Sequence, residues 1–199
     1  MLEIVIVILI GYALGNFATS FILGKIFKKT DIRKHGSGNA GATNALRVFG
    51  IKLAVATFII DALKGALAVM IGNSLLGPTG GLIAGISAVI GHNWPVLLKF
   101  KGGKGIASTI GVVFTINYQI TLICVIVGVL IVIKTRYVSL GSITAISLLP
   151  ILVVIMIRPF DLNFLIFSLV LSTMAMFRHR SNIKRLISGN ESKLGHKSF

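Results

Sequence analysis

Long apolar runs fill most of this chain and limit what it can fold into. Apolar residues make up 55% of the 199 residues and charged residues only 13%, which is more hydrophobic surface than a soluble core can hide. A helix that spans a bilayer needs about 20 apolar residues, so there is room for several spans and short loops. The sequence therefore predicts an all-α, polytopic integral membrane helical bundle that forms a single domain over residues 1–199.

Positive charge is concentrated in the polar segments between these runs. Lys and Arg number 20 against five Asp and Glu, which gives a net charge of +15. Basic residues close to the ends of spans stay on the cytoplasmic side, so the excess indicates topology and anionic ligands, and no nucleic acid partner is expected. The single cysteine, Cys124, lies in an apolar run. We expect neither a metal site nor a cofactor.

The apolar runs predict seven transmembrane helices, with the N-terminus outside and the C-terminus in the cytoplasm. Residues 106–133 supply two of them, if the chain crosses out and back around Asn117. An alternative has five spans and treats these half-length pieces as re-entrant. In both arrangements three polar clusters face the cytoplasm. The other expected spans cover 2–27, 52–75, 81–98, 138–157 and 162–177, with an external turn over 73–80 and a helix break at Pro95.

Two opposite charges, Asp61 and Lys64, lie inside the second expected span. They are three positions apart and so share one face of a helix, although charges at this depth are costly. One interpretation is an ion pair that satisfies itself within the bundle. The other is a lining for a polar cavity, and the sequence alone does not separate the two.

The first polar cluster, residues 35–47, is rich in glycine. Its glycines match the G-x-G-x-x-G spacing of a dinucleotide site, but that motif requires a preceding strand, and here a spanning helix is expected. What remains is a set of small residues that expose backbone donors. Thr43 or Asn44 is expected to cap a helix that begins near Ala45, and such a helix start attracts anions.

The second cluster, residues 91–109, places three lysines and three glycines between two apolar runs. It fails the Walker spacing, because Leu98 stands where a glycine is needed and Gly105 where a serine or threonine is needed. We expect a simple phosphate cradle instead. Lys104 would supply the charge, and Ser108 or Thr109 would donate from the first turn of the next helix.

The third cluster, residues 178–191, leaves the last span at the expected cytoplasmic surface. Taken alone, it is typical of a basic segment that binds anionic lipid headgroups. His179 lies beside two arginines, so it could be a cationic donor as well as a base. Glu191, one of only five acids, is expected to tie the basic tail together.

In order and spacing, the three clusters resemble the motifs of the bacterial acyl-phosphate:glycerol-3-phosphate acyltransferases, the membrane-embedded PlsY type. The resemblance covers nearly the whole chain. Any one motif would be weak evidence, but three in register are specific. The matching segments are 36–44 with Arg47, 91–95 with 100–105, and 179–191.

The resemblance implies transfer of a fatty acyl group from acyl phosphate to the 1-hydroxyl of sn-glycerol 3-phosphate. The products are 1-acyl-glycerol 3-phosphate (lysophosphatidate) and inorganic phosphate, in the first acylation of bacterial phospholipid synthesis. It also implies an enzyme of the bacterial inner membrane whose active site faces the cytoplasm. Its partners would be the two substrates, membrane lipid and, by docking, the enzyme that synthesises acyl phosphate.

Residue roles follow from the same resemblance. Ser37 and Arg47 are expected to support turnover, and His179 and Asn182 the catalytic step. The attacking hydroxyl loses its proton either to His179 or to a substrate phosphate oxygen, and we favour the second because arginines surround His179. Structural roles are expected for Glu191, Asp61 and Lys64. The residues expected to bind substrate are Gly36, Gly38, Asn39, Gly41, Thr43, Asn44, His92, Lys101, Gly102, Gly103, Lys104, Gly105, Ser108, Thr109 and Arg185.

A different class of function remains open, namely a small transporter for an anionic solute with Asp61 and Lys64 along its path. Against it, the polar clusters gather on one face, whereas an alternating-access path needs comparable chemistry at both mouths. A lipid-binding scaffold would explain the basic tail but leave the glycine clusters without a role.

Overall fold

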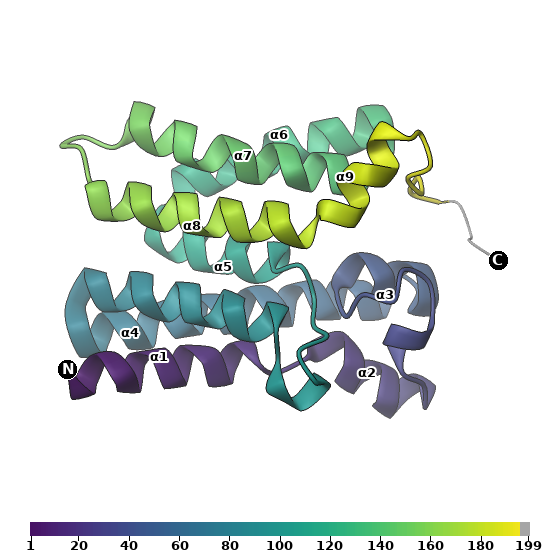
Figure 1. The fold of residues 1–199 in the computed structure, drawn as a ribbon, viewed down its shortest axis with the longest axis horizontal. Helices are drawn as coiled ribbons and strands as arrows, with labels where there is room; N and C mark the ends of the chain where they lie inside the picture. The colour runs from purple at the N-terminus through teal and green to yellow at the C-terminus, as the bar shows by residue number, and fades with distance from the viewer. Residues whose placement is uncertain (196–199) are drawn as a thin grey trace. The chain divides into compact units, whose positions relative to one another are not determined.

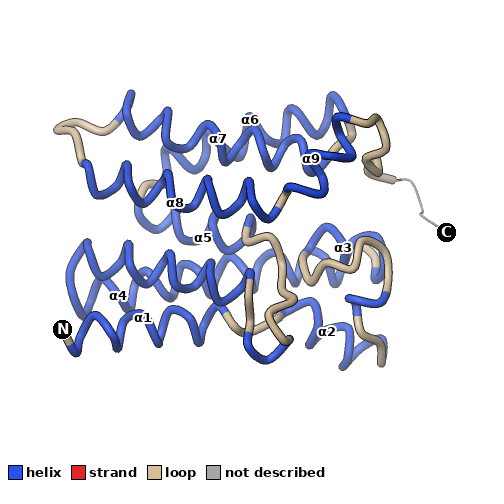
Figure 2. The backbone as a smooth tube through the Cα atoms, in the orientation of Figure 1, coloured by secondary structure: helices blue, strands red, loops and turns tan. Residues whose placement is uncertain are grey.

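The structure is a computed structural model that describes residues 1–195, and these form helices and connecting loops without a β-strand (Figure 1, Figure 2). The all-α prediction is confirmed for this part of the chain. The described chain divides into two compact units, Met1–Ile116 and the part that starts at Asn117. The assignment of the chain to one domain stays a prediction.

The first unit opens with two helices where we expected one. α1 covers Leu2–Gly15 and α2 covers Thr19–Lys28, and the backbone of Ala18 between them is not helical. The break leaves the carbonyl of Phe17 free of the helical ladder, and it accepts a hydrogen bond from Lys64 Nζ at 2.7 Å. Polar backbone groups at membrane depth need such internal partners, and the hydrogen bond from Lys64 therefore stabilises the break between α1 and α2.

α4, Ile51–Asn93, forms a hairpin of two arms (Figure 1). The arms meet at Leu76 and Gly77, where the backbone leaves the helical region, and a Cβ atom on Gly72 would collide with the backbone oxygen of Gly80. The expected turn over 73–80 is therefore confirmed. The second arm ends at Asn93, two residues before the proline that we expected to break it.

Small residues bring α1 and α5 close to this hairpin. Cβ atoms on Gly11 and Gly15 of α1 would collide with backbone oxygens in the second arm of α4. On the other side, a Cβ atom on Gly111 would meet the carbonyl of Ala62, where α5, Ile106–Ile116, packs against the first arm. Such close backbone approach through small residues is how helices associate in membranes.

Three short elements cover one end of this unit. They are η1, Ile32–Lys34, α3, Ala42–Phe49, and η2, Val96–Leu98. One hydrophobic cluster joins them to the start of α4, and its buried members are Ile32, Ala40, Ala45, Ala54 and Leu98. This cluster holds two loops together that are far apart in sequence, 35–41 and 99–105.

The second unit contains α6, Tyr118–Thr135, α7, Val138–Met156, α8, Leu162–Arg178, and α9, Arg180–Ile187. Asn117 caps α6 and Asp161 caps α8 through side-chain acceptors. The sequence left open whether 106–133 forms one helix or two, and the structure has α5 and α6 with a break at Asn117. The sequence did not predict α9, which bends 60° away from α8.

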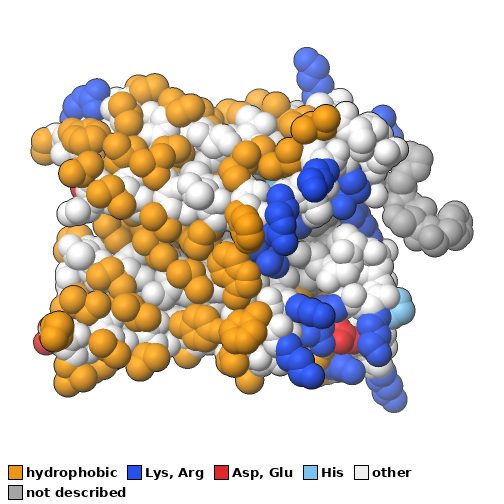
Figure 3. Space-filling view, in the orientation of Figure 1, with side chains coloured by type: hydrophobic (Ala, Val, Ile, Leu, Met, Phe, Trp, Pro, Cys, Tyr) orange, Lys and Arg blue, Asp and Glu red, His pale blue; other side chains and the backbone are white. Residues whose placement is uncertain are grey.

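Length and composition support a protein with several spans. Four helical segments of the described chain are long and apolar enough to cross a membrane, or five if α8 and α9 form one broken span, and α5 is a shorter apolar helix. Large apolar side chains cover the outer faces of both units, while lysine and arginine gather around α2 and η1 in the first unit (Figure 3). The count of seven spans and the orientation of the termini stay predictions.

Candidate active site

The first polar loop is organised by Asn44. We expected Thr43 or Asn44 to cap a helix that begins near Ala45. That was wrong, because α3 begins three residues earlier and its N-cap, Gly41, makes no side-chain hydrogen bond. Asn44 lies inside the helix and turns back toward the loop that precedes it, where the backbone offers it more partners than a cap would.

The amide of Asn44 is fully used by the backbone of this loop. Its Oδ1 accepts a hydrogen bond from the N–H of Ser37 at 2.9 Å. Its Nδ2 lies 3.0 to 3.3 Å from three carbonyl oxygens, those of Ile32, His35 and Asn39. Asn44 is buried, with 1% of its surface exposed. Its contacts therefore shape the loop, and they leave the amide no donor for a substrate.

Two glycines in this loop adopt conformations that other residues rarely adopt. Gly36 and Gly38 have φ angles of 57° and 70°, in the left-handed region that favours glycine. A Cβ atom on Gly36 would also collide with Oδ1 of Asn44. Between them, Ser37 is exposed. The loop thus presents a serine hydroxyl on a backbone that Asn44 holds in place.

The other predicted residues of this cluster lie along the same loop and on α3. Thr43 stands in the first turn of α3 and Arg47 in its last turn, and both are partly buried. Asn39 and Gly41 lie on the loop itself, partly buried.

The second loop is also constrained by its backbone. Lys99, Phe100 and Gly105 have φ angles of 53°, 60° and 81°, so the chain turns sharply on both sides of Gly102 and Gly103. These two glycines are buried, whereas Lys101 is exposed and Lys104 is partly buried. The predicted hydroxyl donors, Ser108 and Thr109, lie in the first turn of α5 and are 0% and 5% exposed.

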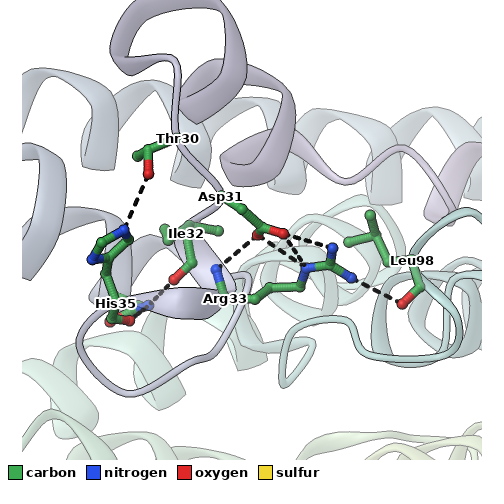
Figure 4. Close-up of polar contacts among 7 residues, drawn as sticks. Thr30, Asp31, Ile32, Arg33, His35 and Leu98 are labelled. Carbon is green, nitrogen blue, oxygen red and sulfur yellow. Dashed lines mark hydrogen bonds and ion pairs between the residues drawn. The ribbon is translucent and has the colours of Figure 1, made fainter.

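Arg33 joins the two loops, and sequence analysis missed it (Figure 4). Its guanidinium forms an ion pair with Asp31 at 2.7 Å and also donates from Nη1 to the carbonyl of Leu98 at 3.1 Å. The hydrogen bond from Arg33 holds the pKa of Asp31 below its usual range. The Asp-x-Arg spacing is visible in the sequence, but nothing there identifies Leu98, 65 positions away, as the partner.

The charges inside α4 belong to a buried polar network. Lys64 Nζ lies 2.6 Å from Asp61 Oδ1 and 2.9 Å from Nδ1 of His92. Asp61 also accepts a hydrogen bond from the hydroxyl of Thr19 at 2.8 Å. These contacts favour the ion-pair interpretation over a lining for a solute path, since both charges are satisfied within the bundle.

The third cluster lies where α8 meets α9. His179 is 3% exposed, and its Nδ1 lies 2.8 Å from the carbonyl oxygen of Ala175. A carbonyl can only accept, so Nδ1 carries a proton and only Nε2 is left to take up another. The sequence placed His179 in a basic surface segment. Its burial follows from the bend between the two helices.

Glu191 connects the third cluster to α7. Its carboxylate accepts hydrogen bonds from Ser139 at 2.8 Å, from Asn182 at 2.7 Å and from Arg185 at 2.7 Å. Burial alone would raise the pKa of Glu191, but these hydrogen bonds outweigh it and hold the pKa below its usual range. The predicted residues Asn182 and Arg185 are thus oriented by one carboxylate. Ser139 is a further member that the sequence did not indicate.

The structure therefore brings the first and second clusters together within the first unit, through Arg33 and the hydrophobic cluster around Leu98. The third cluster belongs to the second unit, with its own network around Glu191. Among the described residues no group of three or more His, Cys, Asp or Glu side chains could hold a metal ion.

The chain is similar in sequence and in fold to glycerol-3-phosphate acyltransferases. The family model for glycerol-3-phosphate acyltransferase matches residues 5–189. A glycerol-3-phosphate acyltransferase of Thermoanaerobacter pseudethanolicus is 52% identical over 194 residues, which are 98% of this chain and 97% of the relative. One from Alkaliphilus metalliredigens is 51% identical over 193 residues, which are 97% of each chain.

Two crystal structures have a similar fold. Both are of PlsY, an integral membrane glycerol 3-phosphate acyltransferase. The glycerol 3-phosphate form matches with a TM-score of 0.91 and 35% identity and covers 96% of both chains. The lysophosphatidic acid form matches with a TM-score of 0.87 and 34% identity and covers 96% of this chain and 95% of the other.

We expect Asn44→Asp to destabilise the first unit. The new carboxylate would face three carbonyl oxygens with no N–H to offer them, and a buried polar group left without its partner costs about 1–3 kcal/mol. The melting temperature in detergent should fall by several degrees, and proteolysis within 35–41 should become faster. Asn73→Asp, at an exposed position in α4, is the matched control and should change neither. Equal melting temperatures for the two variants would contradict the role assigned to Asn44.

Proposed function

This chain belongs to the glycerol-3-phosphate acyltransferase family, and we propose that it transfers a fatty acyl group from acyl phosphate to the 1-hydroxyl of sn-glycerol 3-phosphate. The products are lysophosphatidate and inorganic phosphate. The observation that carries this proposal is the pairing of two glycine-rich loops at one end of the first unit, held by Arg33 and Leu98. The second loop carries lysines, and Arg47 lies on the helix that follows the first. Both proposed substrates carry a phosphate group, and such loops suit phosphate.

For this reaction the protein mainly has to orient the two substrates and stabilise developing negative charge. Acyl phosphate is a mixed anhydride. The glycerol hydroxyl attacks its carbonyl carbon, a new C–O bond forms, and the bond to the phosphate oxygen breaks. The hydroxyl proton leaves, and the departing group is inorganic phosphate. Fixed donors that stabilise the developing negative charge, together with orientation of the two substrates, can supply much of the rate without a covalent intermediate.

Within the first unit, Ser37, Arg47 and Lys104 are the side chains best suited to this task. The hydroxyl of Ser37 is exposed on a loop whose backbone is fixed by Asn44. Arg47 and Lys104 supply positive charge from α3 and from the second loop. We assign Ser37 and Arg47 to turnover, and the segment 101–105 with Ser108 and Thr109 to glycerol 3-phosphate.

For the third cluster, we assign the catalytic step to His179 and Asn182. The hydrogen bond between Nδ1 and Ala175 leaves Nε2 of His179 as its acceptor, and Glu191 fixes the amide of Asn182. The proton of the attacking hydroxyl goes to His179 or to a substrate phosphate oxygen. We favour the phosphate, because Arg178 and Arg180 flank the histidine and disfavour the positive charge that the ring would gain with the proton.

The same proposal includes the membrane. We place the chain in the bacterial inner membrane with seven spans, the N-terminus outside, and the active site and C-terminus on the cytoplasmic side. The support is the distribution of charge, since lysine and arginine lie mostly in the polar segments between the apolar runs, and only Arg158 falls in a loop that this topology places outside. A cytoplasmic site also suits docking of the enzyme that makes acyl phosphate, because an amphiphilic donor is best delivered at the membrane surface.

We expect the purified protein to release inorganic phosphate only when it is given both palmitoyl phosphate and glycerol 3-phosphate. Palmitoyl-CoA in place of palmitoyl phosphate should give no product. Ser37→Ala should lower the rate at least about 100-fold, the usual scale for loss of one transition-state donor. Ser74→Ala, at an exposed serine of α4, should leave the rate unchanged. A folded, lipid-reconstituted sample that releases no phosphate would overturn the proposal.

His179→Gln should separate the two routes for the proton. Glutamine keeps an amide donor but cannot take up a proton. If a substrate phosphate oxygen accepts the proton, the rate should fall less than about tenfold and its pH dependence should stay the same. A loss of 100-fold or more, with the acidic limb of the pH profile abolished, would instead assign general base catalysis to His179, since such catalysis contributes about 10²–10⁴-fold.

Cysteine labelling should decide between seven spans and five. Gln119 is exposed, and it avoids Asn117, whose side chain caps α6. With seven spans, Gln119→Cys in intact cells should react with a membrane-impermeant maleimide, while the buried native Cys124 should not. Ser188→Cys in the third cluster should react only after the cells are opened. Protection of Gln119→Cys under both conditions would favour the re-entrant arrangement.

A further inference from the structure

Two glycines of the second loop lie against the end of α4. Gly102 and Gly103 are not among the residues with left-handed backbone angles, so space, and not conformation, explains why they lack side chains. A Cβ atom on Gly102 would collide with the backbone oxygen of His92, and one on Gly103 would collide with Nε2 of the His92 ring. The N–H of Gly103 also donates to the His92 carbonyl at 3.0 Å. His92 thus forms the surface on which the loop rests.

The third glycine rests on the neighbouring residue. Gly105 has a φ angle of 81°, and a Cβ atom there would lie 2.8 Å from Oδ1 of Asn93. Asn93 is 0% exposed. The last two residues of α4 therefore support all three glycines, and with them the backbone on both sides of Lys104.

The His92 ring is held from its other side. Its Nδ1 lies 2.9 Å from Nζ of Lys64, which lies 2.6 Å from Oδ1 of Asp61. All three side chains are buried, with exposed fractions of 6%, 6% and 1%. The ring is thus fixed between the glycine loop and an ion pair in the first arm of α4.

Lys64 lies at the centre of this network. A lysine ammonium has three N–H donors and no acceptor. Three polar atoms surround Nζ of Lys64, namely Oδ1 of Asp61, Nδ1 of His92 and the Phe17 carbonyl oxygen at 2.7 Å. Nδ1 of His92 also lies 3.5 Å from Oδ1 of Asp61, and Nε2 is the ring atom nearest to Gly103.

We propose that Asp61 and Lys64 are positioning residues that fix the ring of His92, and that this ring sets the place of Gly103 and of Lys104 beside it. The inference rests on the proposed function, in which this loop binds glycerol 3-phosphate. Neither charged residue touches substrate. Buried charges of this kind are costly, and their contacts lead to the glycine loop through a single side chain.

A double-variant cycle tests the contact between ring and loop. Gly103→Ala should lower kcat/KM for glycerol 3-phosphate roughly tenfold or more, the scale of an overpacked contact. His92→Ala alone should also lower it, because the loop loses its support. In that background Gly103→Ala should cost at least about threefold less than in the wild type, because the atoms that the new Cβ meets are gone. An equal loss in both backgrounds would overturn the proposal.

Gly102→Ala is the matched control for this cycle. Its Cβ would collide with the main-chain oxygen of His92 and with the ring of Pro95, and both remain when the His92 side chain is removed. Gly102→Ala should therefore cost as much in the His92→Ala background as in the wild type. A reduced cost at both glycines would show a general loosening of the loop and would also overturn the proposal.

Variants of the ion pair test the positioning role. Asp61→Asn and Lys64→Met should each raise KM for glycerol 3-phosphate at least about fivefold and leave KM for acyl phosphate within about twofold, as expected when only one subsite shifts. A merely destabilised protein would lose active enzyme and show both KM values unchanged, which would overturn the assignment. Ser87→Ala, a buried serine of α4 outside the network, should change neither KM.

The melting temperature of the glycine variants tests the same contact independently of catalytic activity. Gly103→Ala should lower it by less in the His92→Ala background than in the wild type, whereas Gly102→Ala should lower it equally in both. If the wild type failed to turn over substrate, the proposed function would be wrong, but this comparison would still test the packing. An equal loss from Gly103→Ala in both backgrounds would overturn the inference even in an active enzyme.

Discussion

The cost of placing two charges inside an apolar helix governs the arrangement of the first unit. Asp61 and Lys64 are stable at that depth only because each finds partners within the bundle. One partner, the carbonyl of Phe17, is available because the helical ladder is interrupted between α1 and α2. The break and the charge therefore satisfy each other, and neither would be tolerated alone in a lipid environment. The same network continues into His92, at the edge of the candidate active site.

Glycine serves two separate purposes around this site, and they have different consequences. Gly36, Gly38 and Gly105 adopt left-handed backbone angles that favour glycine. Gly102 and Gly103 instead leave room for the end of α4. We expected Gly102 and Gly103 to bind the substrate. The packing shows that their first requirement is closeness to His92, so loss of activity on substitution there would not by itself demonstrate contact with substrate.

Much of the fold could be predicted from the sequence, because hydropathy and helix breakers act locally. The turn near Gly77, the helix end before Pro95 and the break at Asn117 all follow from nearby residues. The break between α1 and α2 could not be predicted, since the partner that stabilises it, Lys64, is 47 positions from Phe17. The contact from Arg33 to Leu98 and the true role of Asn44 were missed for the same reason: the partners are backbone groups, which carry no signal in a sequence.

The few acidic residues show how a strongly basic chain orders its polar segments. Of the five acids, Asp31 caps η1 and pairs with Arg33, and Asp161 caps α8. The two most buried, Asp61 and Glu191, each gather polar side chains beside a helix end, Asp61 with Lys64 and His92, and Glu191 with Asn182 and Arg185. Phosphate substrates require positive charge, but neighbouring cationic side chains repel one another. A carboxylate beside them reduces this repulsion and holds them in place as an anchor. A buried carboxylate in each unit provides that anchor.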